Sequence, residues 1–203
     1  MTRRMIALPL RTTAAAIALL IVAATGAAAD GKGADLFIQK VGQQAIDSLT
    51  GKDVNDAERQ ARFRKILNQT FEVPLIARFT LGRFWRRASE EQQKEYVGLF
   101  EDFIVQAYAA RFRDYSGETF TVGKVREIDE RDALVQSEIS LTDGRRIVVY
   151  WRVRGNSGFK IIDVIVEGVS MAITQRDEFS AIINQNGGKV DGLLTTLREK
   201  TSR

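Results

Sequence analysis

The stretch Ser89–Ser116, SEEQQKEYVGLFEDFIVQAYAARFRDYS, predicts a long amphipathic helix around which the rest of the chain is organised. Ser89 and Gln92 have the spacing of a capping box, and Gly117 follows as a stop signal. The apolar face is wider than one neighbouring helix needs, so we expect the sheet that follows to lie against it. At three- and four-residue spacing this face carries Tyr96, Leu99, Phe100, Phe103, Ile104, Ala107 and Tyr108.

Four runs of alternating apolar and polar residues follow this helix. The turn sequences between them are short, which favours an antiparallel meander over crossover connections. In the third run Val149 and Trp151 share one face, and in the fourth Ile162, Val164 and Val166 do so. The fourth run is apolar on both sides, as a strand between two layers would be. The runs cover residues 120–127, 133–141, 145–154 and 159–166.

Helical patterns also flank these elements. The first covers residues 35–49, Asn55 or Asp56 caps a second, and Pro74 suits the first turn of a short third. Thr174 caps a helix after the sheet, and a leucine-rich helix ends the chain.

We therefore predict an α+β fold in a single domain, residues 30–203. A four-stranded antiparallel sheet, about 118–167, is packed on the long helix. Additional N- and C-terminal helices, in the parts about 30–117 and 168–203, enclose an apolar pocket.

The first 29 residues have the pattern of a cleaved signal peptide. Arginines precede an uncharged run, Ala14–Ala24, which is well short of the roughly 20 residues of a spanning helix. Small residues up to Ala29 then offer a cleavage site, so we expect export to the periplasm and cleavage near Ala29. An uncleaved anchor and, because of Arg3-Arg4, export by the twin-arginine route remain alternatives.

Removal of residues 1–29 changes the charge balance. It takes away three arginines, so Lys+Arg falls from 30 to 27 against 26 Asp+Glu, which leaves about +1. The alkaline isoelectric point therefore gives no support to nucleic-acid binding, and we expect no nucleic-acid partner.

The chain contains no Cys and no His. This excludes His-based triads, Cys nucleophiles, zinc sites with nitrogen or sulfur ligands, and haem held by His. No carboxylate or phosphate-binding motif stands out either. We predict that the protein is not an enzyme and that it uses no cofactor and no metal.

Two local features have competing interpretations. In the segment 78–87, RFTLGRFWRR, arginines alternate with aromatic residues. We interpret it as a corner of the core covered by arginine stems, with a nucleic-acid platform or a membrane-surface patch as alternatives. Asp163, in an apolar strand, is interpreted as structural and paired with Arg152 or Arg154, the alternative being a general base of raised pKa.

Four blocks together resemble the MlaC family of periplasmic phospholipid-binding proteins, also called the toluene-tolerance auxiliary family. They are LIARFTLGRFWRRASEEQQ at 75–93, AYAARFRDYSGE at 107–118, IIDVIVEGVSMAITQRDEF at 161–179 and GGKVDGLLTTLREK at 187–200. The resemblance spans essentially the whole mature chain. It implies an NTF2-like sheet joined to helices around a deep apolar pocket for the acyl chains of a phospholipid.

The resemblance also implies partners. Members of this family carry phospholipid between an outer-membrane lipoprotein complex and an inner-membrane ABC transporter with its membrane-anchored lipid-binding subunit. This transport maintains the lipid asymmetry of the outer membrane.

For such a pocket we expect a volume at or above the top of the range of about 300–1,000 Å³ common for small-molecule sites. Arginines could offer two donors to a head-group phosphate, and the candidates are Arg83, Arg86 and Arg111. The candidate lining residues are Phe100, Phe103, Ile104, Tyr108, Val149, Trp151, Ile162, Val164 and Val166.

Three alternatives remain open. The ligand could be a hopanoid or another amphiphile. An NTF2-like sheet can also house a small isomerase or dehydratase, for which Asp163 and Tyr150 are the candidate residues. An adaptor protein with an apolar partner surface is the third, and a solid interior would favour it.

Overall fold

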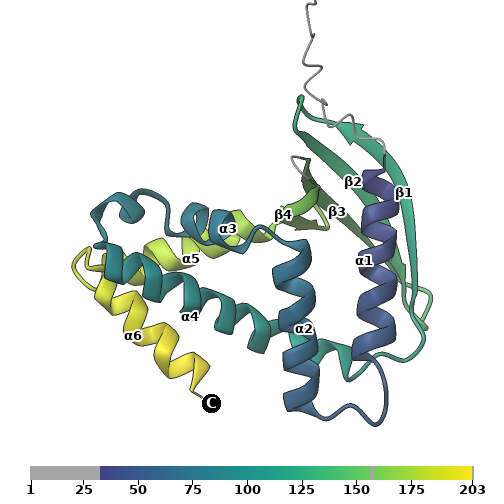
Figure 1. The fold of residues 1–203 in the computed structure, drawn as a ribbon, viewed down its shortest axis with the longest axis horizontal. Coiled ribbons are helices and arrows are strands. Elements are labelled where there is room, and N and C mark those ends of the chain that lie inside the picture. The colour runs from purple at the N-terminus through teal and green to yellow at the C-terminus, as the bar shows by residue number, and fades with distance from the viewer. Residues whose placement is uncertain (1–32, 156–157, 203) are drawn as a thin grey trace, which may run out of the picture.

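Six α-helices and a small antiparallel sheet make up the computed structural model, which describes residues 33–155 and 158–202 (Figure 1). The N-terminal segment for which we predict a signal peptide lies outside these residues. Among the described residues, no helix has the length and hydropathy needed to cross a membrane.

The helices are α1 (Ala34–Leu49), α2 (Asp56–Thr70), α3 (Val73–Leu81), α4 (Glu90–Ala109), α5 (Met171–Gln185) and α6 (Val190–Thr201), with 3₁₀ turns η1 (Gly82–Arg87) and η2 (Ala110–Phe112). The strands are β1 (Thr119–Glu127), β2 (Asp132–Ser140), β3 (Arg146–Gly155), β4 (Phe159–Val166) and β5 (Val169–Ser170).

Side-chain caps mark the starts of three of the six described α-helices, α2, α4 and α5. Asn55 accepts a hydrogen bond from the backbone N–H of Glu58, and Ser89 forms the complete capping box with Gln92. Both predictions are confirmed. The long helix ends at Ala109, short of the predicted Ser116, because the chain tightens there into η2.

The prediction that Thr174 caps a helix is wrong. Helix α5 starts one turn earlier, where Ser170 accepts the N–H of Ile173. Asp163 reinforces this start, since its carboxylate accepts from the Ala172 N–H at 3.1 Å and from the Ser170 hydroxyl at 2.6 Å. Asp163 is thus structural, as predicted, but it binds a helix N-terminus.

The arginines expected to pair with Asp163 bind Asp132 instead. Arg152 donates to the Asp132 carboxylate at 2.6 Å and Arg154 at 2.7 Å, and the Asp132 side chain is fully buried. Hydrogen bonds from Arg154 and then Arg152 hold the pKa of Asp132 below its usual value, against the opposing effect of burial.

The sheet is the predicted antiparallel meander, in the order β1-β2-β3-β4-β5, with the two-residue β5 as an added edge. Its β3–β4 register shifts once: Arg152 pairs with Asp163 and the next residue, Val153, pairs with Ile161. Ile162 is the extra residue of this bulge. The strict alternation that placed Ile162 with Val164 and Val166 is therefore interrupted at this point of the strand.

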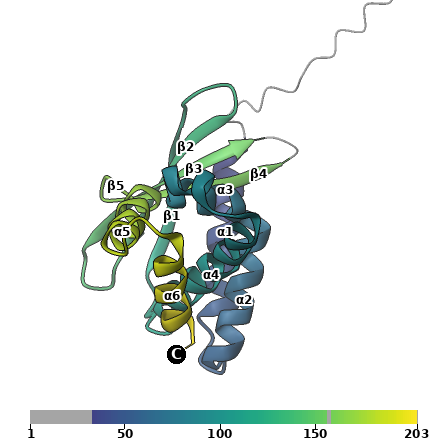
Figure 2. The same cartoon turned by 90° about the vertical axis from the view of Figure 1, so that its left-hand side faces the viewer.

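Helix α1 lies along the sheet, over β1 and β2, whereas α4 packs mainly with α6, α2 and α3 (Figure 1). Both views, Figure 1 and Figure 2, show α4 and α6 beside each other, and Figure 1 shows the pair away from the strands. The aromatic face of α4 packs against helices, because Phe179 of α5 makes edge-on contacts with Tyr96, Phe100 and Phe103. It is the C-terminal helices that cover this wide face.

The buried side chains form two clusters. The first, here the helical cluster, joins α3, α4, α5 and α6 and includes Phe84, Tyr96 and Phe100. The second, here the sheet cluster, joins α1 and α2 to the strands and includes Ile38, Val135 and Ile161. Two half-buried phenylalanines, Phe63 and Phe71, pack against both clusters.

The segment 78–87 is a core corner, as predicted. Phe84 is fully buried, and the guanidinium carbon of Arg83 lies 4.9 Å from the centre of its ring. One aromatic residue departs from this pattern, because Phe79 remains 41% exposed.

Candidate functional site

An apolar cavity of about 380 Å³, partly open to solvent, lies between the helices α1 and α2 and the sheet. This volume is near the lower end of the range for small-molecule sites, so the predicted larger pocket is not what the structure contains. The apolar lining consists of Ile38, Val41, Ala45, Ile46, Phe63, Ile66, Phe71, Phe112, Phe120, Ile139, Leu141, Ile147 and Trp151, with Gly42 in one wall.

The wall of α1 follows from the sequence of that helix. Val41 and Ala45 occur one turn apart on its sheet-facing side, and Gly42 stands beside them. A Cβ at Gly42 would lie 2.4 Å from the Phe120 ring, so only glycine lets this ring approach the helix so closely. Phe120 in turn meets Trp151 edge-on, with 6.4 Å between ring centres.

The polar rim of the cavity lies between η2 and β1. Its lining residues are Arg111, Asp114, Tyr115, Glu118 and Thr119. The Tyr115 hydroxyl donates to the Glu118 carbonyl at 2.7 Å. Backbone hydrogen bonds at Glu118 and Ser116 lower the pKa of the Glu118 carboxyl, so this group is an anion near neutral pH.

Arg111 is the cationic group of the rim. Its guanidinium carbon lies 5.2 Å from the centre of the Tyr108 ring, and the side chain is exposed. Stacking on a ring leaves the N–H edge of a guanidinium free for an acceptor. The apolar cavity is thus bordered by one cation, Arg111, whose guanidinium N–H groups can donate to a ligand.

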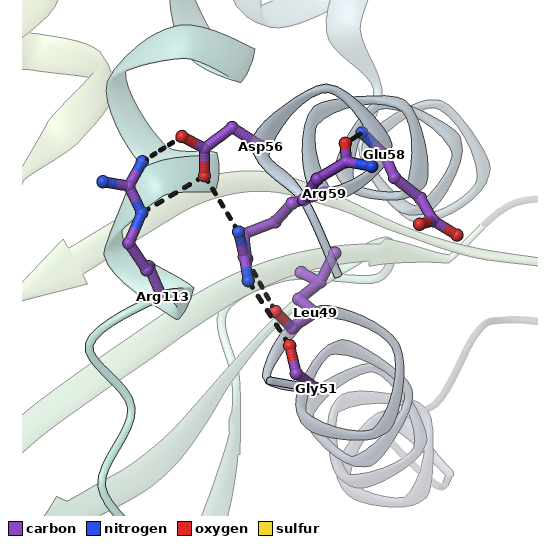
Figure 3. Close-up of polar contacts among 7 residues, drawn as sticks. Leu49, Gly51, Asp56, Glu58, Arg59 and Arg113 are labelled. Atoms are coloured by element: carbon purple, nitrogen blue, oxygen red, sulfur yellow. Dashed lines mark hydrogen bonds and ion pairs between the residues drawn. The ribbon is translucent and has the colours of Figure 1, made fainter. Parts of the chain in front are cut away.

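A buried arginine fastens the rim segment to the corner between α1 and α2 (Figure 3). The Arg59 Nε donates to the Leu49 carbonyl at 2.8 Å and its Nη1 to the Asp56 carboxylate at 3.0 Å. The same carboxylate binds Arg113, which is next to the rim residue Asp114 in sequence. Asp56 therefore connects the end of α1, the start of α2 and the rim.

The structure brings two of the predicted site residues to this cavity, Trp151 and Arg111. Val164 pairs with Trp151 across the strands and packs with the sheet cluster. Val149 is buried, and Ile162 and Val166 are half-buried in the sheet. None of these last four is among the described residues that line the cavity.

The predicted lining residues of α4 lie elsewhere. Phe100 belongs to the helical cluster, and Phe103 and Ile104 pack against it. Tyr108 lies under Arg111 at the end of α4. The head-group candidates Arg83 and Arg86 are on η1, at the opposite end of α4 from the rim (Figure 1). The physical reason is that the C-terminal helices, rather than the sheet, cover α4.

Sequence reasoning missed the wall that α1 and α2 contribute. The signal was present in α1, whose apolar stripe includes Ile38 and Val41, but a stripe does not show whether it faces a core or a void. Arg59 was also missed, because an arginine in a charged helix is usually exposed. Its burial depends on backbone carbonyls ten residues earlier, at Leu49.

The two residues that the sequence suggested for an isomerase, Asp163 and Tyr150, do not line this cavity. Asp163 is occupied at the start of α5, and Tyr150 points to the opposite face of the sheet from Trp151, its neighbour in β3. In the described part of the chain, no group of His, Cys, Asp and Glu side chains has an arrangement that could hold a metal ion.

The fold and the cavity define an α+β protein that holds an apolar chamber between a helical hairpin and an antiparallel sheet, with a cation at its rim. Residues 39–199 match the family described as MlaC protein, and the chain belongs to this family.

The proteins similar to this chain include a curated relative and a solved structure. The toluene tolerance protein ttg2D of Pseudomonas putida is 24% identical over 110 residues, 54% of this chain and 51% of that protein, so the chain spans about half the length of this curated relative. A phospholipid-binding protein from Ralstonia solanacearum, solved in complex with a phospholipid, has a TM-score of 0.75 and 21% identity. It covers 83% of this chain and 97% of its own, and the likeness shows a shared fold.

Proposed function

We propose that this protein is a periplasmic phospholipid carrier that holds acyl-chain carbons in the cavity between α1, α2 and the sheet. The observation that carries the proposal is the cavity itself, which has apolar walls and a polar rim at one end. Each methylene group hidden from water contributes about 0.8 kcal/mol, so an apolar chamber favours an aliphatic ligand. The solved relative with a bound phospholipid supports the same ligand class.

In this proposal the head group stays at the rim. Arg111 offers donors to a phosphate there, and the guanidinium is the better donor set for such a group because it can make two parallel hydrogen bonds. Trp151 forms part of the cavity wall, with Phe120 against it. The remaining lining comes from α1 and α2.

We further propose the cycle that family membership suggests. The mature chain, after cleavage near Ala29, receives and delivers lipid between an outer-membrane lipoprotein complex and an inner-membrane ABC transporter with its membrane-anchored lipid-binding subunit. It thereby serves the lipid asymmetry of the outer membrane. The protein transports its ligand without chemical change.

The test is mass spectrometry of organic extracts from gently purified protein, combined with a variant that fills the cavity. Ala45→Phe places a ring in the chamber rather than in a packed core, so the protein should fold but carry little lipid. Ala107→Phe is the matched control, because Ala107 is exposed on α4. A folded Ala45→Phe protein with undiminished lipid would contradict the proposed cavity. An extract rich in hopanoid would identify hopanoid, rather than phospholipid, as the ligand.

A further inference from the structure

Five arginines on neighbouring elements have no carboxylate partner among the described residues. Nine other arginines, by contrast, form ion pairs with Asp or Glu. Of the eight described arginines for which no ion pair is found, five are therefore gathered in one region, and the other three are Arg111, Arg126 and Arg131. The five belong to α3, η1 and α5: Arg78, Arg83, Arg86, Arg87 and Arg176.

Four of these side chains lie over aromatic rings. The guanidinium carbons of Arg83 and Arg87 lie 4.9 and 5.9 Å from the centre of the Phe84 ring. Arg176, from α5, lies 5.2 Å from the centre of the Phe79 ring, and Arg78 lies 6.0 Å from that of Trp85. Because stacking uses the face of the guanidinium, its N–H edge stays available to acceptors.

Exposed apolar side chains occupy the same region. Of the six large apolar residues exposed in the described chain, four are on α3, on β5 just before α5, or in the first turn of α5. They are Leu75, Phe79, Val169 and Ile173, between 36% and 53% exposed. Apolar groups gathered in this way are more informative than the same number scattered singly.

The helices α3 and α5, with β5 directly before α5, hold these residues near one another. Both begin on β4, because the N–H of Glu72 donates to the Ile161 carbonyl at 3.0 Å and the N–H of Ala172 donates to Asp163 at 3.1 Å. From there α3 and α5 pack along each other (Figure 1). We name the four apolar residues and five arginines together the α3–α5 surface.

This surface is remote from the cavity rim. η1 directly precedes the capping residue Ser89 of α4, and the rim follows the other end of α4. A helix of 20 residues is about 30 Å long, so roughly that distance separates the η1 arginines from Arg111. A partner on the α3–α5 surface would leave the rim uncovered.

We propose that the α3–α5 surface is a docking site for a protein partner that presents carboxylates around an apolar side chain. The three elements carry five arginines against two acids, Asp177 and Glu178. Arginine matches carboxylate geometry with two parallel hydrogen bonds, so the charge and the shape of the partner group agree.

The composition favours a protein over an anionic bilayer. Lysine is absent from α3, η1 and α5, and protein interfaces are enriched in arginine and aromatic residues and depleted in lysine. A bilayer bound at this surface would also lie about 30 Å from the rim, too far for the cavity to reach it.

Photo-crosslinking in cells tests the proposal. A photoreactive phenylalanine analogue replaces Phe79, and the control replaces Ile128, which is 43% exposed in the β1–β2 connection. We expect the Phe79 position to give a protein adduct whose crosslinked peptide carries Asp or Glu beside apolar residues. No adduct above the Ile128 control, or a peptide without acids, overturns the proposal.

The purified protein provides the quantitative arm. The probe is a synthetic peptide with the sequence of the crosslinked segment, and its affinity should fall about tenfold in Arg86→Gln/Arg87→Gln, as the loss of charge-assisted contacts predicts. The double variant Arg126→Gln/Arg131→Gln, at exposed arginines elsewhere, should bind as the wild type does. Equal loss in both variants would show non-specific attraction and contradict the proposal.

Vesicles with about one third phosphatidylglycerol test the alternative that the α3–α5 surface binds an anionic membrane. We expect no more binding to them by the wild type than by Arg86→Gln/Arg87→Gln. Binding that depends on these arginines would identify a membrane site and overturn the proposed protein partner. Both variants should keep their bound lipid, so these results are read separately from those on the cavity.

Discussion

The backbone of Gly42 lies so close to the Phe120 ring that a Cβ on this glycine would stand 2.4 Å from a ring carbon. This contact joins α1 to the first strand at the wall of the cavity. The width of the chamber therefore depends on a residue that has no side chain.

Gly42→Ala should push the Phe120 ring toward the cavity. We expect the variant to lose about 1–3 kcal/mol of stability through overpacking and to retain less lipid. The control is Gly98→Ala on α4, which has open space around the added methyl group and should gain up to about 1 kcal/mol from helix propensity. Urea unfolding at equilibrium measures both. Changes of the same sign would contradict the close contact.

The pair Phe112→Ala and Phe103→Ala tests which wall is functional. Both side chains are half-buried, but Phe112 lines the cavity and Phe103 packs on the helical cluster. Each change should cost about 1–3 kcal/mol, less than for a fully buried phenylalanine. Only Phe112→Ala should alter the amount of lipid recovered. Lipid loss in Phe103→Ala alone would show that the aromatic face of α4 lines the lipid site, as the sequence predicted.

Arg111→Gln should weaken retention of phospholipid without changing the fold. An exposed charge-assisted hydrogen bond contributes about 1 kcal/mol, which corresponds to roughly a fivefold weaker affinity. Arg126→Gln, on the exposed side of β1, is the matched control. Competition with a fluorescent phospholipid gives the affinities, and equal values for the two variants would remove Arg111 from the head-group site.

Asp132→Asn should destabilise the sheet, because it removes the negative charge and one of the two buried acceptor oxygens that Arg152 and Arg154 use. Both arginines are partly exposed, so we expect about 2–3 kcal/mol, below the value for fully buried pairs. Asp53→Asn, on the exposed α1–α2 connection, should change little.

The same carboxylate predicts a pH dependence. The folded-state pKa of Asp132 is lowered, so its contribution is complete above the unfolded-state value of about 3.9 and is lost as the pH falls through the lower folded-state value. Urea midpoints between neutral and acidic pH should fall more steeply for the wild type than for Asp132→Asn. Parallel curves would show that Asp132 does not contribute to the pH dependence of the stability.

Local signals in the sequence predicted most elements of the fold, although not the start of α5 or the short strand β5. The capping box at Ser89, the cap at Asn55 and the turn sequences between the strands each depend on residues a few positions apart. The α+β class and the antiparallel order of the sheet follow from these elements and are confirmed.

The packing of those elements was harder to predict, because it depends on contacts distant in sequence. A wide aromatic face, as on α4, shows that a large partner exists but not whether it is the sheet or the C-terminal helices. The bulge at Ile162 interrupts an otherwise regular alternation of strand residues. The cavity wall likewise brings together residues that are far apart in the chain, such as Gly42 and Phe120.

The division of the interior into a helical cluster and a sheet cluster has an evolutionary consequence. The buried residues of the helical cluster are not among those that line the cavity. Natural selection for ligand size and selection for stable folding therefore act largely on different positions. Related chains can change the dimensions of the chamber over many generations while the packing of α4, α5 and α6 is inherited unchanged.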